Sequence, residues 1–119
     1  MTEHITVKKI QRLRADTYPI RFALKQADAV TPLDITGYTF LLTVDLAEDP
    51  PDATNNLFQV TGTLTDPVNG VVDFFLSDTD SDQTPGDYFY DAQLKDTAGK
   101  RRTFCRGSFQ FEQDITKVL

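Results

Sequence analysis

Residues 84–94, Thr-Pro-Gly-Asp-Tyr-Phe-Tyr-Asp-Ala-Gln-Leu, constrain the fold of this chain more than any other stretch. Pro85-Gly86 is a turn signal, because proline fixes φ and glycine adopts backbone angles that other residues avoid. Beyond the turn the pattern alternates, and one face would carry Tyr88, Tyr90, Ala92 and Leu94. A period of two over eight residues predicts a half-buried β-strand.

Shorter alternating stretches on both sides of this strand predict its partners. Turn residues separate them, above all Asn69-Gly70, which is a strong hairpin signal. Their inward faces predict a core of Tyr18, Ile20, Phe22, Phe40, Leu42, Val60, Val72, Phe74, Tyr88, Tyr90, Leu94, Phe109 and Phe111. We expect an exposed loop at Ala47–Asn56 and one short helical turn within Ser77–Thr84.

The chain of 119 residues is the size of one domain. Six or seven short strands, with no amphipathic helix of useful length, predict an all-β protein, an antiparallel β-sandwich. We expect residues 1–14 to form an N-terminal arm or first strand and residues 15–119 to form the sandwich. The Gly-x-Tyr entry to the strand after Pro85 is also typical of a tyrosine corner in an immunoglobulin-like sandwich of about seven strands.

The net charge of −6 conceals an asymmetry along the chain. Residues 1–27 hold six basic and two acidic residues, a balance of +4, and residues 97–119 hold five basic and two acidic residues, a balance of +3. Residues 28–96 hold fourteen acidic residues and one lysine, a balance of −13. First and last strands often lie side by side in sandwiches, and would then gather a basic edge of Lys8, Lys9, Arg12, Lys100, Arg101 and Arg102. Such an edge serves either assembly or simple solvation.

Catalytic and metal-binding constellations are hard to assemble from this sequence. The single histidine, His4, lies in the terminal arm, and the single cysteine, Cys105, stands at an inward position where a thiol is usually a small hydrophobe. Asp78-Thr-Asp-Ser-Asp82 has the first spacings of a calcium loop, but Gln83 and Phe89 replace the glycine and the distal glutamate. We therefore expect no enzyme, no cofactor and no metal site.

Three apolar residues, Leu41, Phe89 and Phe104, point away from the core by their alternation. A contiguous group of exposed apolar side chains marks a partner surface, whereas scattered ones are ordinary. The lone cysteine, together with an N-terminus that lacks an apolar signal core, favours folding in a reducing cytoplasm. The basic cluster at Lys100–Arg102 makes nucleic-acid binding conceivable, but the acidic body of the domain would repel phosphates.

Several segments together resemble the immunoglobulin-like domains of tailed-phage virion proteins, most nearly the N-terminal domain of upper baseplate proteins. They are Arg14-Ala-Asp-Thr-Tyr18, Leu33-Asp-Ile-Thr-Gly-Tyr-Thr-Phe40, Gly70-Val-Val-Asp-Phe-Phe-Leu-Ser77, Pro85-Gly-Asp-Tyr-Phe-Tyr-Asp91, Gly107-Ser-Phe-Gln-Phe111 and Asp114-Ile-Thr116. The resemblance implies a structural component of the virion, made in the bacterial cytoplasm and assembled as several copies with other virion proteins. It implies no cofactor and no catalysis. The sequence has no run of eighteen apolar residues, so we also expect no membrane partner.

We therefore predict that the protein is an assembly module of the tail, baseplate, neck or fibre attachment. It would dock through a flat sheet face and through complementary charge. The alternative is an immunoglobulin-like decoration or adhesion domain that binds host surface glycans. A glycan site needs aromatic side chains exposed in a loop or groove, and Tyr38 is the one loop-adjacent candidate.

Overall fold

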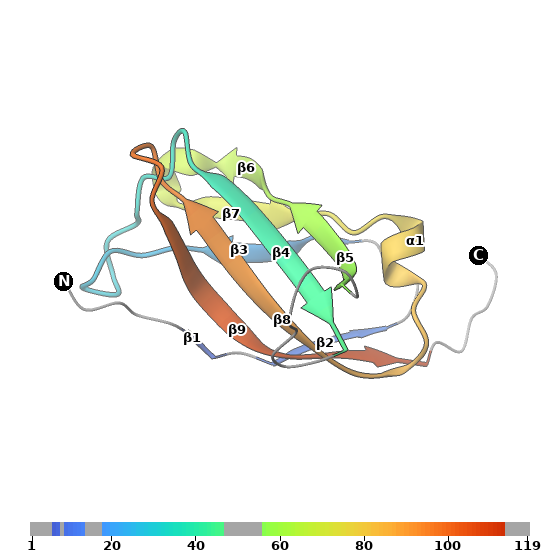
Figure 1. Ribbon diagram of the computed structural model, residues 1–119. Coiled ribbons are helices and arrows are strands. Elements are labelled where there is room, and N and C mark those ends of the chain that lie inside the picture. Colours follow the sequence, from blue (N-terminus) through green and yellow to red (C-terminus); the bar gives the residue numbers. More distant parts are fainter. Residues whose placement is uncertain (1–5, 8, 14–17, 47–55, 114–119) are drawn as a thin grey trace.

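The protein is built from two β-sheets that pack face to face, as seen in the computed structural model (Figure 1). The structure describes residues 6–7, 9–13, 18–46 and 56–113. Within these ranges the elements are β1 (Thr6–Val7), β2 (Ile10–Leu13), β3 (Ile20–Ala23), β4 (Thr39–Asp45), β5 (Asn56–Thr61), β6 (Thr63–Asp66), the 3₁₀-helix η1 (Pro67–Asn69), β7 (Val71–Phe74), α1 (Asp78–Ser81), β8 (Gly86–Lys95) and β9 (Arg101–Glu112).

The larger sheet has six strands in the order β1-β9-β8-β4-β5, with β2 also paired to β9. The smaller sheet has three strands in the order β3-β7-β6. The predicted all-β architecture of two packed layers is confirmed. One part of it differs from the expected antiparallel arrangement, because β1 and β2 run parallel to β9.

Strand β8 lies inside the larger sheet, between β4 and β9, and its predicted alternation is confirmed. Its inward side chains are all buried: Tyr88, Tyr90, Ala92 and Leu94. The Tyr88 hydroxyl donates a hydrogen bond of 2.6 Å to the Thr84 carbonyl, four residues upstream. This bond fastens the turn at Pro85-Gly86 to the start of the strand.

One stretch of chain crosses from the larger sheet to the smaller at Gly62, between β5 and β6. The Gly62 amide donates to the Phe40 carbonyl at 2.9 Å. A Cβ atom at Gly62 would lie 2.7 Å from the Cβ of Phe40 and 2.8 Å from a methyl group of Val72. Only glycine fits this crossing without displacement of its neighbours.

Aromatic side chains fill much of the space between the sheets. Ten predicted core residues are buried: Phe40, Leu42, Val60, Val72, Phe74, Tyr88, Tyr90, Leu94, Phe109 and Phe111. Two more, Ile20 and Phe22, are partly buried and pack against them. Most ring pairs meet edge to face, as Phe22 and Phe74 do at 5.8 Å and 84°, which is a preferred geometry for aromatic pairs.

The prediction that Tyr18 belongs to this core is wrong, since its side chain is 59% exposed. Strand β3 begins at Ile20, after Pro19, so Tyr18 precedes the regular alternation that placed it inward. The Tyr18 ring instead lies beside the guanidinium of Arg12, whose carbon is 4.1 Å from the ring centroid. A bend before the strand therefore turns this aromatic outward.

The prediction that Phe104 points away from the core is also wrong, because its side chain is only 7% exposed. The pairing of β8 with β9 shifts register at this point: Ala92 lies opposite Cys105, whereas Gln93 lies opposite Thr103. Phe104 is the extra residue of this β-bulge, and both Phe104 and Cys105 are buried. A bulge interrupts strict alternation, so two successive residues face the core.

The helical turn predicted within Ser77–Thr84 is present as α1. Its start is a capping box, in which the Ser77 hydroxyl accepts from the Asp80 amide and the Asp80 carboxylate accepts from the Ser77 amide. Of the predicted loop at Ala47–Asn56, residues 47–55 lie outside the described residues, and Asn56 already belongs to β5. The predicted boundary at residues 14–15 also lies outside the described residues. Within the described residues no helix is long and apolar enough to span a membrane.

Candidate functional site

The side of the larger sheet that faces away from the smaller one is hereafter the outer face. None of the helices and strands that the structure describes covers it, since η1 and α1 lie at the ends of the sandwich (Figure 1). Its side chains come mainly from the alternate positions of β4, β5, β8 and β9, and many are half-buried amides and hydroxyls. Hydrogen bonds between strands tie some of them together, as Gln11 Nε2 donates to Gln110 Oε1 at 3.1 Å and Gln59 Nε2 donates to Thr43 Oγ1 at 3.2 Å.

Two of the three apolar residues predicted for an interface lie on the outer face, but they do not touch. Leu41 and Phe89 are both half-buried. Leu41 is opposite Gln93, four residues along β8 from Phe89, which is a separation of about 13 Å. Because Phe104 is in the core, the predicted contiguous apolar group does not form.

A pair of opposite charges occupies the stretch between these two apolar residues. Asp91 on β8 is directly opposite Arg106 on β9 and next to Thr43 on β4. Partial burial raises the pKa of the Asp91 carboxyl, and the positive charge of Arg106 acts in the opposite direction. The middle of the outer face is therefore polar and internally neutralised.

The basic edge predicted from the two chain ends is wrong in its geometry. Arg12 on β2 is opposite Phe111, nine residues along β9 from Arg102, which corresponds to about 30 Å. The Arg12 side chain is also 3% exposed, and its guanidinium donates to the Tyr18 carbonyl. Lys9 is exposed between β1 and β2, and Lys8 lies outside the residues whose side chains are described.

A different basic group does form, from residues that are neighbours across β8 and β9. Lys95 is directly opposite Arg101, and Lys100 is exposed in the preceding turn. Arg102 is half-buried beside the inward-facing Leu94, and its Nε is buried without a hydrogen-bond partner. Alternation therefore places Arg101 on the outer face and turns Arg102 toward the interior.

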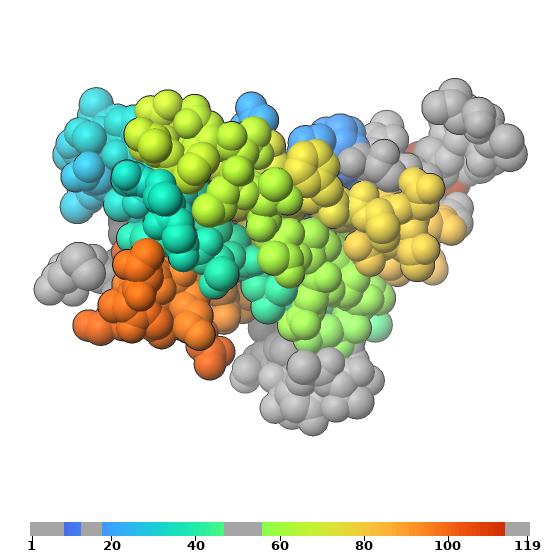
Figure 2. All heavy atoms as spheres, turned by 90° about the horizontal axis from the view of Figure 1, so that it is seen from above, coloured from blue at the N-terminus to red at the C-terminus, as the bar shows by residue number. Residues whose placement is uncertain are grey.

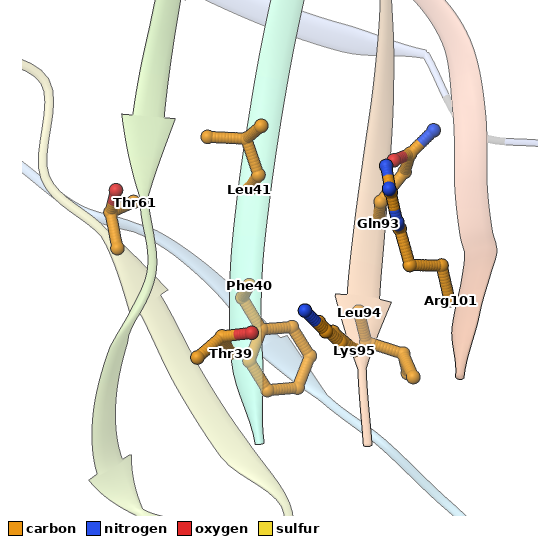
Figure 3. A pocket seen from close by; sticks show the side chains of 8 residues that line it. All are labelled: Thr39, Phe40, Leu41, Thr61, Gln93, Leu94, Lys95 and Arg101. Carbon is orange, nitrogen blue, oxygen red and sulfur yellow. The ribbon is translucent and has the colours of Figure 1, made fainter. Parts of the chain in front are cut away.

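Lys95 and Arg101 border a shallow hollow of about 300 Å³ at one end of the outer face. Figure 3 shows the residues that line it, from β4, β5, β8 and β9: Thr39, Phe40, Leu41, Thr61, Gln93, Leu94, Lys95 and Arg101. Leu41 supplies an apolar side chain, and two hydroxyls and an amide surround it. The hollow suits a group that carries both an apolar part and a negative charge. Sequence reasoning missed it because its residues come from four separate strands.

The outward side of the smaller sheet carries an ion pair with two hydrogen bonds. The Arg21 guanidinium donates two hydrogen bonds to the Asp73 carboxylate, at 2.8 and 2.9 Å, and the Thr65 hydroxyl donates a third at 2.7 Å. The bonds from Arg21, together with the bond from Thr65, hold the pKa of Asp73 below its usual value, although burial opposes them. Because every participant is satisfied within the fold, this cluster is structural.

The buried thiol of Cys105 lies 3.2 Å from the Tyr90 hydroxyl, deep between the sheets. Burial, and then the hydrogen bond with Cys105, raise the pKa of Tyr90 well above its ordinary value. The inward position predicted for Cys105 is confirmed. Across the described part of the chain, no three His, Cys, Asp or Glu side chains are grouped so as to hold a metal ion.

Comparison of the chain with protein-family models and with curated proteins finds no match.

Proposed function

We propose that this protein is an immunoglobulin-like structural component of a tailed-phage particle that acts as an assembly module. The observation that carries the proposal is the outer face. It is a broad sheet surface, uncovered by any described element, with half-buried Leu41 and Phe89 set among amides and hydroxyls. Non-obligate protein interfaces are about as apolar as the rest of a protein surface, so a mixed surface of this kind suits partner docking.

The strand order supports the immunoglobulin-like part of the proposal. In that fold the first, second, fifth and fourth strands form one sheet, and the third, sixth and seventh form the other. The order β3-β7-β6 corresponds to the second, fifth and fourth strands, and the order β9-β8-β4 to the seventh, sixth and third. The first strand departs from this arrangement, because β1 and β2 pair with β9 in the larger sheet. Strand β5 takes the place of one of the two strands that variable-type domains add.

The hydrogen bond from the Tyr88 hydroxyl to the Thr84 carbonyl also supports this part of the proposal. A tyrosine near the start of the sixth strand, bonded to backbone a few residues upstream, is typical of the tyrosine corner. The motifs that resemble those of phage virion proteins include this segment, Pro85–Asp91, so the resemblance and the geometry concern the same residues.

Binding to host glycans is the weaker alternative. Tyr38, the loop aromatic on which it depended, is half-buried and stacks on Phe40 at 6.4 Å, where it packs against the core. A sugar-binding site uses an aromatic face that is open to solvent. We therefore place docking of protein partners first.

The test is to ask whether the protein is part of purified phage particles. Particles are banded in a density gradient, and an antibody against this chain locates it by immunogold electron microscopy. We expect labelling at one position on the tail, baseplate, neck or fibre attachment, with several copies per particle. Particles that lack the protein, or a protein that instead binds glycans on an array, would contradict the proposal.

A further inference from the structure

Two like charges stand directly opposite each other beside the hollow of the outer face. Lys95 on β8 is paired in register with Arg101 on β9. Like charges at directly opposite positions destabilise a sheet. Neither cation forms an ion pair with a carboxylate among the described residues. A carboxylate from outside the molecule would relieve this repulsion and gain two charge-assisted hydrogen bonds.

The opposite end of the same sandwich is acidic. Strand β8 shows this change of charge along its length: exposed Asp87 is its second residue, and Lys95, its last residue, lies about 26 Å away. Exposed Asp78 and Asp82 lie in and just after α1, and exposed Glu112 closes β9 beside the start of β8. This acidic end is defined here by Asp78, Asp82, Asp87 and Glu112.

Exposed apolar side chains accompany these carboxylates. Phe75, Leu46 and Tyr18 are 51%, 63% and 59% exposed, and each lies on the part of its strand or loop nearest the acidic end. Phe75 is three residues before Asp78 and two residues before Ser77, the N-cap of α1. The acidic end therefore offers an apolar group beside negative charge, which complements a hollow with Leu41 beside positive charge.

The two ends point in opposite directions. In Figures 1 and 2 the orange turn before β9, which leads into Arg101, lies at the left of the molecule, and α1 projects at the right. We propose that the hollow is a docking site for the acidic end of a second copy of this chain. The inference rests on the proposed assembly function and specifies the partner and the contact.

The contact is heterologous, because different surfaces of the two copies meet. Repetition of a heterologous contact produces a closed ring or an open fibre, depending on the rotation between copies. In the proposed contact the carboxylates of the acidic end face the cations of Lys95 and Arg101, and an exposed apolar side chain of that end packs toward Leu41. Charge steers the encounter, and the apolar centre holds the copies together.

Two variants, each blocked at one end, test this arrangement. One variant carries Lys95→Glu and Arg101→Glu, and the other carries Asp78→Lys and Asp87→Lys. We expect the wild type to form concentration-dependent oligomers in analytical ultracentrifugation, and each variant alone to associate about tenfold more weakly or worse. In a mixture of the two variants the reversed hollow of one faces the reversed acidic end of the other, and the unchanged hollow faces the unchanged acidic end. We therefore expect the mixture to regain oligomers in which the two variants alternate.

A matched control carries the same change in net charge elsewhere. Lys9→Glu with Lys25→Glu alters two exposed lysines outside the hollow, and we expect its oligomers to match those of the wild type. Wild-type association should also weaken between about 0.1 M and about 1 M salt, since the Debye length falls from about 10 Å to about 3 Å. Circular dichroism melts establish that every variant is folded.

Several results would overturn the inference. They are a wild type that stays monomeric at high concentration, oligomers unaffected by the hollow variant, or mixed variants that stay apart although both are folded. Saturation of the hollow by glucuronic acid, without self-association, would assign it to acidic sugars instead. If the inference fails while the protein is still found in purified particles, the assembly function stands and the partner is another virion protein.

Discussion

Replacement of Phe104 by alanine tests which side of the sheet this residue occupies. The ring is 7% exposed and meets Phe22 edge to face at 5.4 Å and Phe40 at 5.6 Å. Truncation of a buried phenylalanine costs about 3–5 kcal/mol, which includes the cavity it leaves. We expect Phe104→Ala to lose that much unfolding free energy and to lower the Tm by roughly 10–20 °C.

The assay is urea denaturation followed by tyrosine fluorescence and circular dichroism, with Phe89→Ala as the matched control. Phe89 also lies on a strand of the larger sheet, β8, but its side chain is half-buried on the outer face. We expect this control to lose about 1 kcal/mol or less of unfolding free energy, because truncation of a half-buried side chain on the surface leaves no cavity in the core. Phe104→Leu should fall between the wild type and Phe104→Ala, since it keeps part of the buried volume.

The reverse order of the two alanine variants would refute the reasoning. If Phe89→Ala were the more destabilising and Phe104→Ala nearly neutral, unbroken alternation would hold through β9 and the bulge would be wrong. The two variants should also differ in assembly, since Phe89→Ala changes the outer face and Phe104→Ala does not.

Three further outcomes follow from particular contacts. Asp73→Asn breaks the ion pair with Arg21. Hydrogen bonds from Arg21 lower the pKa of Asp73 in the folded state, so the ion pair adds stability above about pH 4. This added stability is lost as the pH falls through the lower pKa of the folded state. Denaturation at pH 7 and pH 3 should therefore show a larger gap from the wild type at pH 7 than at pH 3, and an equal gap at both would contradict this. Gly62→Ala should cost about 1–3 kcal/mol in thermal melts, because its Cβ would meet Phe40 and Val72, and a neutral variant would count against the close crossing. Tyr88→Phe should cost about 1 kcal/mol in the same melts through loss of the bond to Thr84, and a more stable variant would argue against that bond.

Much of the fold could be predicted because local patterns carried enough information. Alternation in 84–94 identified β8 and its four buried residues, since a half-buried strand must place every second side chain inward. The Ser77 and Asp80 pair marks the start of α1, because a capping box depends only on residues three apart. Asn69-Gly70 likewise marked a turn, where Gly70 adopts φ of 76°.

The candidate site was predicted much less well. The outward positions of Leu41 and Phe89 followed from alternation, but the basic edge did not form. The prediction of that edge assumed that neighbouring first and last strands bring their basic side chains close together. The parallel register of β2 on β9 instead carries Arg12 far from Arg101, and this register depends on contacts between residues about 99 apart in sequence.

The sequence by itself thus determined where strands occur and which face of each is apolar, because these follow from the period of the residues in one stretch. The tertiary structure decided which residues lie opposite each other on neighbouring strands. The bulge that buries Phe104 exists only in the pairing of β8 with β9, and the opposition of Lys95 to Arg101 depends on that same register. The hollow needs four strands at once. Such features depend on the register between strands, which the alternation within any one strand does not determine.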